Sequence, residues 1–338
     1  MGAVELARRA VAPLLVALAL SITLGIHVTR VAPLHKHSQA TFYSLEEGLE
    51  HYREMPRPWR SRLFANACAS LFVSRAESPE PAEVSAAAEA RGREVEAFAR
   101  GAGVWAGAWF LATCVVYWLA LGPAALFFAL GTFAGVIYGS LPGVDARVYP
   151  WDLPALFWYA LFTMAVLRGR YRALLLIPLA VGFKETALVY ALAFLLWEEA
   201  SWRRRLGWFA AVGVLSVAVK LGIDVVTGNS RYFFTMASGG GEYLRQNLRN
   251  LVTFDARHLV LVNAGLLAAF LVVPLRGPRA RTLRVIALAF LCGVLVWGNM
   301  QEVRIFYELL PVSLAGLAGA FLPELLSRSG SDPASRPT

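Results

Sequence analysis

A lysine and a glutamate stand side by side in the middle of an apolar stretch that runs from Ala173 to Trp197. An ionisable side chain at the centre of a membrane costs about 2.5–3.5 kcal/mol on insertion scales, unless it faces a cavity or a partner. Lys184 and Glu185 are therefore candidates for chemistry. The ammonium group can hold an anion, and the carboxylate can orient a neighbour or accept a proton.

Further carboxylates and guanidinium groups lie between the apolar segments or at their ends. The longest connecting stretch, about 29–101, contains Glu46, Glu47 and Glu50, followed by Arg57, Arg60 and Arg62. Asp152 opens an apolar segment and is followed by Leu153-Pro154, which is typical of a helix N-cap. Arg304 and Glu308 are four residues apart at the last apolar segment. They form either a local ion pair or part of a site, because an idle carboxylate there is costly.

The elements that must position these residues are membrane helices. Of the 338 residues 57% are hydrophobic and 16% charged, whereas soluble domains carry about 25% charged residues. Several apolar runs approach the roughly 20 residues needed to cross about 30 Å of hydrocarbon. We predict an all-α, polytopic transmembrane bundle that cannot fold in water alone. The predicted spans are 11–28, 102–120, 123–140, 152–167, 206–223, 258–275, 282–299 and 306–325.

The stretch with Lys184-Glu185 is predicted to be a hairpin and not a single span. It has basic clusters on both sides, Arg168–Arg172 and Arg203–Arg205, and membrane proteins keep such clusters on the cytoplasmic side. Two arms of about eleven residues, each roughly 16 Å long, satisfy this rule, and Gly182 helps to break the helix between them. The hairpin gives about nine to ten membrane segments, with both termini cytoplasmic and the Lys184-Glu185 tip toward the outer side.

The chain is predicted to form one transmembrane domain, 1–326, followed by a disordered cytoplasmic tail, 327–338. In the long outer loop, Arg62–Val73 is predicted as an interfacial or re-entrant helix, and 78–102 as a solvated surface helix. The net charge of +9 does not indicate nucleic-acid binding, because the basic residues cluster at the ends of apolar runs. No metal site is predicted from a histidine motif, and no Walker A or G-x-S-x-G motif occurs.

The predicted topology places these polar residues on the outer side of the membrane, and this arrangement is similar to that of a known family. It resembles the GT-C superfamily of polytopic glycosyltransferases, which use lipid-linked sugar donors. The resemblance is carried by the long first outer loop, by the run from Tyr149-Pro150-Trp151-Asp152 through Arg168–Arg172 to Phe183-Lys184-Glu185-Thr186, and by Gln301-Glu302-Val303-Arg304 to Glu308-Leu309-Leu310-Pro311. It covers most of the chain as topology and about a fifth of it as motif.

The resemblance implies a GT-C-like fold and transfer of a sugar from a polyprenyl-phosphate-type donor at the outer face of the bacterial inner membrane. A carboxylate would act as general base on a glycan, lipid or protein acceptor, and basic residues would hold the lipid phosphate. Base candidates are Glu46, Glu47 and Glu50. Phosphate candidates are Arg57, Arg60, Arg62, Lys184 and Arg304. Asp152, Glu185 and Glu308 would orient these groups, and a divalent cation, Mg²⁺ or Mn²⁺, could assist.

Two alternatives from other classes stay open. One is a non-catalytic membrane protein, either a transporter or flippase for envelope lipids or polysaccharides, or a scaffold. No inverted repeat of the kind found in transporters is visible, since the long first outer loop has no counterpart in the second half. The other is a different lipid-dependent envelope enzyme, such as a polymerase or a phosphate-group transferase.

Overall fold

The computed structural model describes residues 3–34, 41–42, 52–53, 62–73, 84–140, 148–228, 244–249, 278–297 and 307–321. Every regular element in these ranges is helical, which confirms the all-α prediction. The α-helices are α1 (Ala3–Val31), α5 (Leu63–Ala69), α6 (Val84–Leu121), α7 (Ala125–Gly139), α8 (Asp152–Leu167), α9 (Ile177–Phe183), α10 (Leu192–Leu195), α11 (Trp202–Val226), α15 (Pro278–Trp297) and α16 (Leu310–Phe321). Four 3-10 helices join them: η1 (Ala32–Leu34), η2 (Gly122–Ala124), η3 (Tyr171–Leu176) and η4 (Glu185–Ala191). The predicted span 258–275 and the tail from 327 lie outside the described residues.

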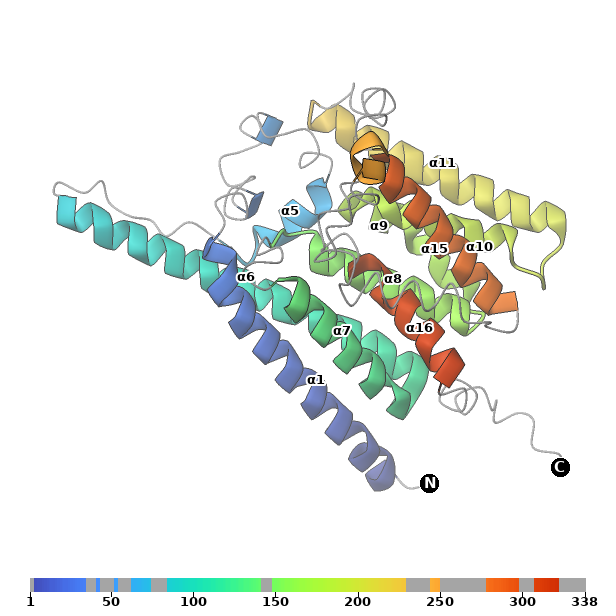
Figure 1. Ribbon diagram of the computed structural model, residues 1–338, viewed down its shortest axis with the longest axis horizontal. Helices are drawn as coiled ribbons and strands as arrows, with labels where there is room; N and C mark the ends of the chain where they lie inside the picture. Colours follow the sequence, from blue (N-terminus) through green and yellow to red (C-terminus); the bar gives the residue numbers. More distant parts are fainter. Residues whose placement is uncertain are drawn as a thin grey trace.

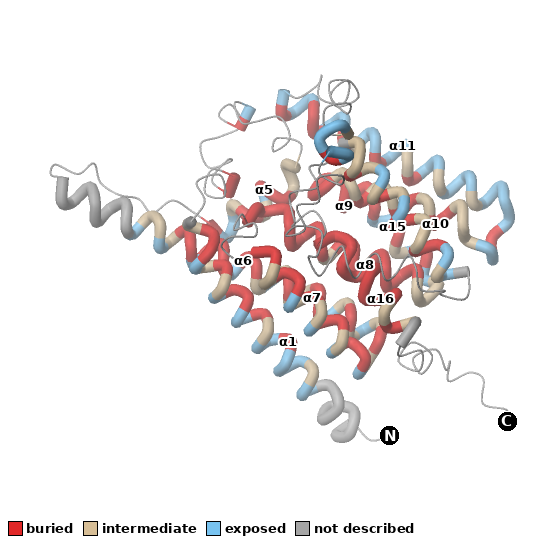
Figure 2. The backbone as a smooth tube through the Cα atoms, in the orientation of Figure 1, coloured by how far each residue is buried: buried red, intermediate tan, exposed pale blue. Residues whose placement is uncertain are grey.

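Helix α8 lies at the centre of the bundle (Figures 1 and 2). Thirteen of its sixteen residues are buried, so it is covered on all sides. The hairpin segment, α15 and α16 pack against it on one side, and α6 packs against it on the other. A helix that is apolar all round belongs in such a position, and the run 152–167 was predicted with the bounds that the structure shows.

Helices α1 and α6 approach each other closely because small residues line their contact. A Cβ atom on Gly103 would lie 2.3 Å from the Thr29 hydroxyl oxygen and 2.6 Å from the Gly25 carbonyl oxygen, and one on Gly107 would lie 3.0 Å from the Ser21 carbonyl oxygen. Small residues at every fourth position let two membrane helices pack backbone to backbone. This contact anchors the first helix to the rest of the bundle.

Gly103→Ala should therefore destabilise the protein by about 1–3 kcal/mol, as overpacking does elsewhere. The matched control is Gly213→Ala on α11, where an added Cβ has no atom within 4 Å. Alanine is the better helix former by about 1 kcal/mol, so the control should be neutral or stabilising. Thermal unfolding in detergent measures both variants, and equal midpoints would contradict the packing argument.

Within the described residues, three segments are long and apolar enough to cross a membrane: Val11–Val31, Arg93–Gly139 and Trp202–Val226. Their outward faces are also apolar. Leu15 on α1 is 59% exposed, and Val214 on α11 is 70% exposed. Water would penalise such surfaces and lipid would cover them. A helical membrane protein follows from these features, while the count of nine to ten segments stays a prediction.

The segment before the second predicted span differs from expectation. The stretch 78–102 was predicted as a separate surface helix, but from Val84 onward it belongs to α6, which continues without a break to Leu121. Ala, Glu and Arg favour helix throughout, and the turn comes only at Gly122, where φ is +57° and Pro123 follows. At 1.5 Å per residue the 38 residues reach about 57 Å, well beyond a bilayer core of about 30 Å.

The broken hairpin is confirmed as a backbone feature. Helix α9 ends at Phe183, Lys184 is extended with φ −157° and ψ 127°, and η4 begins at Glu185. The two arms return to the same place, since the rings of Tyr171 and Trp197 stack with centroids 4.7 Å apart. Gly182, which was predicted to help break the helix, is the next-to-last residue of α9, and the ring of Phe64 occupies the space that a Cβ atom would need there.

The basic clusters meet at one end of the bundle, at the right of Figure 1, where α8 ends and α11 and α15 begin. Arg279 at the start of α15 donates to the Leu167 carbonyl (3.0 Å), and Arg205 donates to the Ala200 and Glu198 carbonyls (2.7 Å each). Arginines thus close the open end of the hairpin by capping free carbonyl groups. The charge argument that led to the hairpin agrees with this gathering.

Cysteine labelling tests which end faces out. A cysteine replacing Leu71, which is 82% exposed next to α5, should react with a membrane-impermeant maleimide on intact cells. A cysteine replacing Arg172, which is exposed at the basic end, should react only after lysis, because basic clusters stay in the cytoplasm. The native cysteines Cys68, Cys114 and Cys292 are first replaced by serine or alanine. The reverse pattern would invert the predicted topology.

Candidate functional site

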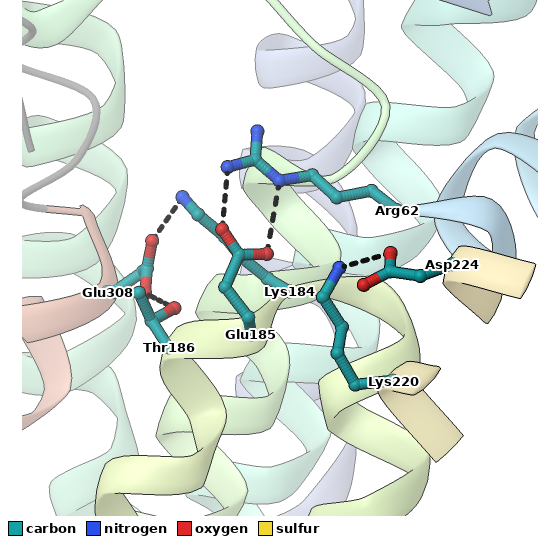
Figure 3. Close-up of polar contacts among 7 residues, drawn as sticks. All are labelled: Arg62, Lys184, Glu185, Thr186, Lys220, Asp224 and Glu308. Carbon is teal, nitrogen blue, oxygen red and sulfur yellow. Dashed lines mark hydrogen bonds and ion pairs between the residues drawn. The ribbon is translucent and has the colours of Figure 1, made fainter. Parts of the chain in front are cut away.

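The hairpin break carries a buried ion pair. Lys184 forms an ion pair with Glu308, and the Thr186 hydroxyl donates to the other oxygen of the same carboxylate (Figure 3). The Lys184 and Glu308 side chains are only 7% and 1% exposed. The extended backbone at Lys184 explains this arrangement, because it ends the helix and turns the ammonium group toward Glu308, two residues before α16.

A second ion pair joins the hairpin to the start of α5. The Arg62 guanidinium, directly before α5, donates to both oxygens of Glu185, through Nη2 at 3.1 Å and Nε at 3.5 Å. Its central carbon lies 4.4 Å from the centre of the Trp151 ring. A guanidinium held by a fork and by a ring face keeps one orientation, so Arg62 is positioned more tightly than a surface arginine.

The turn that carries Trp151 is itself clamped. The Asp152 carboxylate accepts a hydrogen bond from the Tyr149 backbone N–H at 3.1 Å, Tyr149 stacks on Trp151 at 4.9 Å, and Trp105 of α6 donates to the Pro150 carbonyl at 3.0 Å. The predicted N-cap role of Asp152 was wrong by one position. Trp151 is the N-cap, and Asp152 is the first helical residue with its carboxylate turned back to the loop.

Helix α11 adds a pair that the sequence analysis did not single out. Lys220 and Asp224 are both buried, with 3.2 Å between the ammonium nitrogen and the carboxylate oxygen. Lys220 also acts electrostatically on Glu185, and its side chain points toward the same group in Figure 3. The signal that identifies the pair is two ionisable residues one turn apart inside an otherwise apolar span.

The described part of the site combines three cations with three carboxylates: Arg62, Lys184, Lys220, Glu185, Asp224 and Glu308. Five residues predicted for the site lie around the hairpin break or support it: Asp152, Arg62, Lys184, Glu185 and Glu308. The other six lie outside the described residues: Glu46, Glu47, Glu50, Arg57, Arg60 and Arg304. Within the described ranges, no three His, Cys, Asp or Glu side chains form a group that could hold a metal ion.

No family model, no curated protein and no solved structure matches this chain. The function is therefore argued from the site. The site is distinguished by its buried ion pairs. Removing one partner would leave an uncompensated buried charge, which costs several kcal/mol. Apolar side chains of similar volume would pack the bundle equally well, so the charges indicate a role other than packing. Ionisable side chains inside a membrane bundle usually pair with one another and mark functional sites.

Proposed function

We propose that this protein is a membrane glycosyltransferase of GT-C-like fold, which transfers a sugar from a polyprenyl-phosphate-type donor to an acceptor at the outer face of the bacterial inner membrane. The observation that carries the proposal is the cluster at the hairpin break, where Lys184 and Arg62 are held beside each other by Glu308 and Glu185. A lipid-linked substrate reaches such a site from the bilayer, so its phosphate group arrives at the depth of the broken helix.

The reaction needs two kinds of group. The acceptor oxygen attacks the anomeric carbon, the bond between that carbon and the phosphate oxygen breaks, and the lipid phosphate leaves with the electron pair. Lys184 and Arg62 would stabilise the charge on the leaving phosphate, and Arg62 offers a planar fork that fits two of its oxygens. The proton of the acceptor passes to a carboxylate, for which Glu46, Glu47 and Glu50 are the candidates.

The cations would exchange one anion for another. Without donor, Glu308 and Glu185 neutralise Lys184 and Arg62, which keeps the cations charged in an apolar bundle. A donor phosphate would take over one edge of each cation, while Thr186 keeps its hydrogen bond to Glu308 and Lys220 acts on Glu185. Asp152 would act on the site through the turn that holds Trp151 under Arg62. A divalent ion, if the reaction uses one, needs ligands beyond the described carboxylate pairs.

Transfer from a radiolabelled polyprenyl-phosphate sugar, assayed in membranes, tests the proposal. The double substitution Lys184→Met/Glu308→Gln removes both charges of the buried pair, so it leaves no orphaned ion, and transfer should fall at least a hundredfold. Arg304→Ala should act in the same direction. Arg100→Ala is the control, since Arg100 and its partner Glu96 are both more than two thirds exposed. Full transfer by the double variant would overturn the assignment.

A measurement of donor binding beside the transfer assay separates the alternatives. Donor binding without any labelled product would favour a transporter, flippase or scaffold for envelope lipids. A product that carries the phosphate together with the sugar would identify a phosphate-group transferase instead of a glycosyltransferase. Absence of donor binding would show that the cluster at the hairpin break is not a donor-binding site, in an enzyme or in a transporter.

A further inference from the structure

The basic end of the bundle contains a guanidinium group whose hydrogen-bonding capacity is not used. Arg168 follows α8 directly, and its Nε and Nη2 atoms are buried without a hydrogen-bond partner in the described part of the chain. Buried donors in folded proteins nearly always have an acceptor. The side chain as a whole is only half-buried, so a small rotation would bring these donors to an acceptor on another molecule.

Two more arginines converge on the same place. Gly169 adopts a left-handed conformation with φ +66°, and the Arg279 guanidinium lies 3.0 Å from the position of an added Cβ atom on that glycine. Burial, and then the charges of Arg170 and Arg279, lower the pKa of the Arg168 guanidinium. Within the described ranges none of Arg168, Arg170 and Arg279 forms an ion pair with a carboxylate. At the hairpin break each cation has a carboxylate partner, whereas here the nearby Glu198 and Glu199 act on Tyr171 and form no ion pair with these three arginines in the described ranges.

We propose that Arg168, Arg170 and Arg279 bind the phosphate group of an anionic phospholipid at the end of the bundle opposite the hairpin break. A phosphate oxygen accepts charge-assisted hydrogen bonds from several guanidinium groups at once. It would supply the anion that the cluster lacks.

The surroundings favour a lipid over free phosphate. The adjacent 3-10 helix exposes Leu175 and Leu176, which are 40% and 44% exposed, and Leu179 on α9 is 45% exposed. These apolar side chains follow the basic turn directly and offer a surface for an acyl chain. Their position beside the arginines matches the junction of an acyl chain with its headgroup. The proposal is independent of the glycosyltransferase function, since it uses none of the residues of that site.

Native mass spectrometry of the full-length protein, after delipidation in detergent, tests the inference. We titrate phosphatidylglycerol, phosphatidylcholine and inorganic phosphate separately. Phosphatidylglycerol should bind at least tenfold more tightly than either of the others, and Arg168→Gln and Arg279→Gln should each weaken its binding about tenfold, as expected for the loss of charge-assisted hydrogen bonds. Arg203→Gln, an exposed arginine at the start of α11, should change it less than twofold.

Folding is checked by the thermal midpoint of each variant. If Arg168→Gln fails to fold, the exposed Arg279→Gln decides the question alone. Equal weakening by Arg203→Gln would mean diffuse attraction by the basic end and would overturn the site. Loss of stability in Arg168→Gln with unchanged lipid binding by Arg279→Gln would also overturn it, and would assign Arg168 to the end of α8. Equal affinity for inorganic phosphate would replace the lipid by a soluble anion.

Discussion

Glu308→Gln should destabilise this protein by about 3–5 kcal/mol, the usual cost of breaking a buried ion pair from one side. The substitution leaves the Lys184 ammonium group, whose side chain is only 7% exposed, without its anion. Neither water nor lipid can replace that partner at this depth. Unfolding of the purified protein by sodium dodecyl sulfate in mixed micelles measures the free energy of unfolding, and Lys184→Met should cost a comparable amount.

The decisive variant is the double substitution Lys184→Met/Glu308→Gln. A buried pair replaced on both sides is often neutral in stability, so the double variant should recover most of what either single variant loses. The control is Arg100→Ala/Glu96→Gln on an exposed i, i+4 pair, where the pair is worth about 0.2–0.5 kcal/mol. Additive losses at Lys184 and Glu308 would contradict direct pairing between them.

The hairpin could be predicted from the sequence because two independent energetic arguments favour it. A charged pair at the centre of an apolar stretch is expensive, and basic clusters on both sides forbid a single span. Both costs depend on residues within one stretch of sequence, 168–205, so no knowledge of the rest of the fold was needed. The same holds for α8, whose apolar run has its ends marked by Asp152 and Arg168.

The partners within the site were not predictable in this way. Glu308 is 122 residues from Thr186, and Arg62 is 123 residues from Glu185, so these pairings depend on how the helices pack. The sequence offered Arg304 as the near partner of Glu308, whereas the structure pairs Glu308 with Lys184. Lys220 and Asp224 carried a signal in the sequence, two ionisable residues one turn apart in an apolar span, but their burial follows only from the packing of α11 against the hairpin.

The last prediction concerns Arg62 and follows from its geometry. Arg62→Lys keeps the positive charge but loses the two-point contact with Glu185 and the stacking on Trp151. If Arg62 holds the donor phosphate, the variant should bind a polyprenyl monophosphate about tenfold more weakly, a loss of about 1.4 kcal/mol. Binding is measured by displacement of a fluorescent polyprenyl phosphate from the purified protein, so the result does not depend on the acceptor.

Arg205→Lys is the matched control, because Arg205 also makes two hydrogen bonds but lies at the basic end of the bundle. It should affect stability and leave polyprenyl-phosphate binding unchanged. Trp151→Leu, which removes the ring under Arg62, should weaken binding by a smaller factor, since a cation–π contact is worth about 0.5–2 kcal/mol. Combined with Arg62→Lys, it should add little, because lysine has already lost the stacked geometry. Unchanged binding in Arg62→Lys would show that Arg62 only ties α5 to the hairpin, and the phosphate would then belong to Lys184 alone.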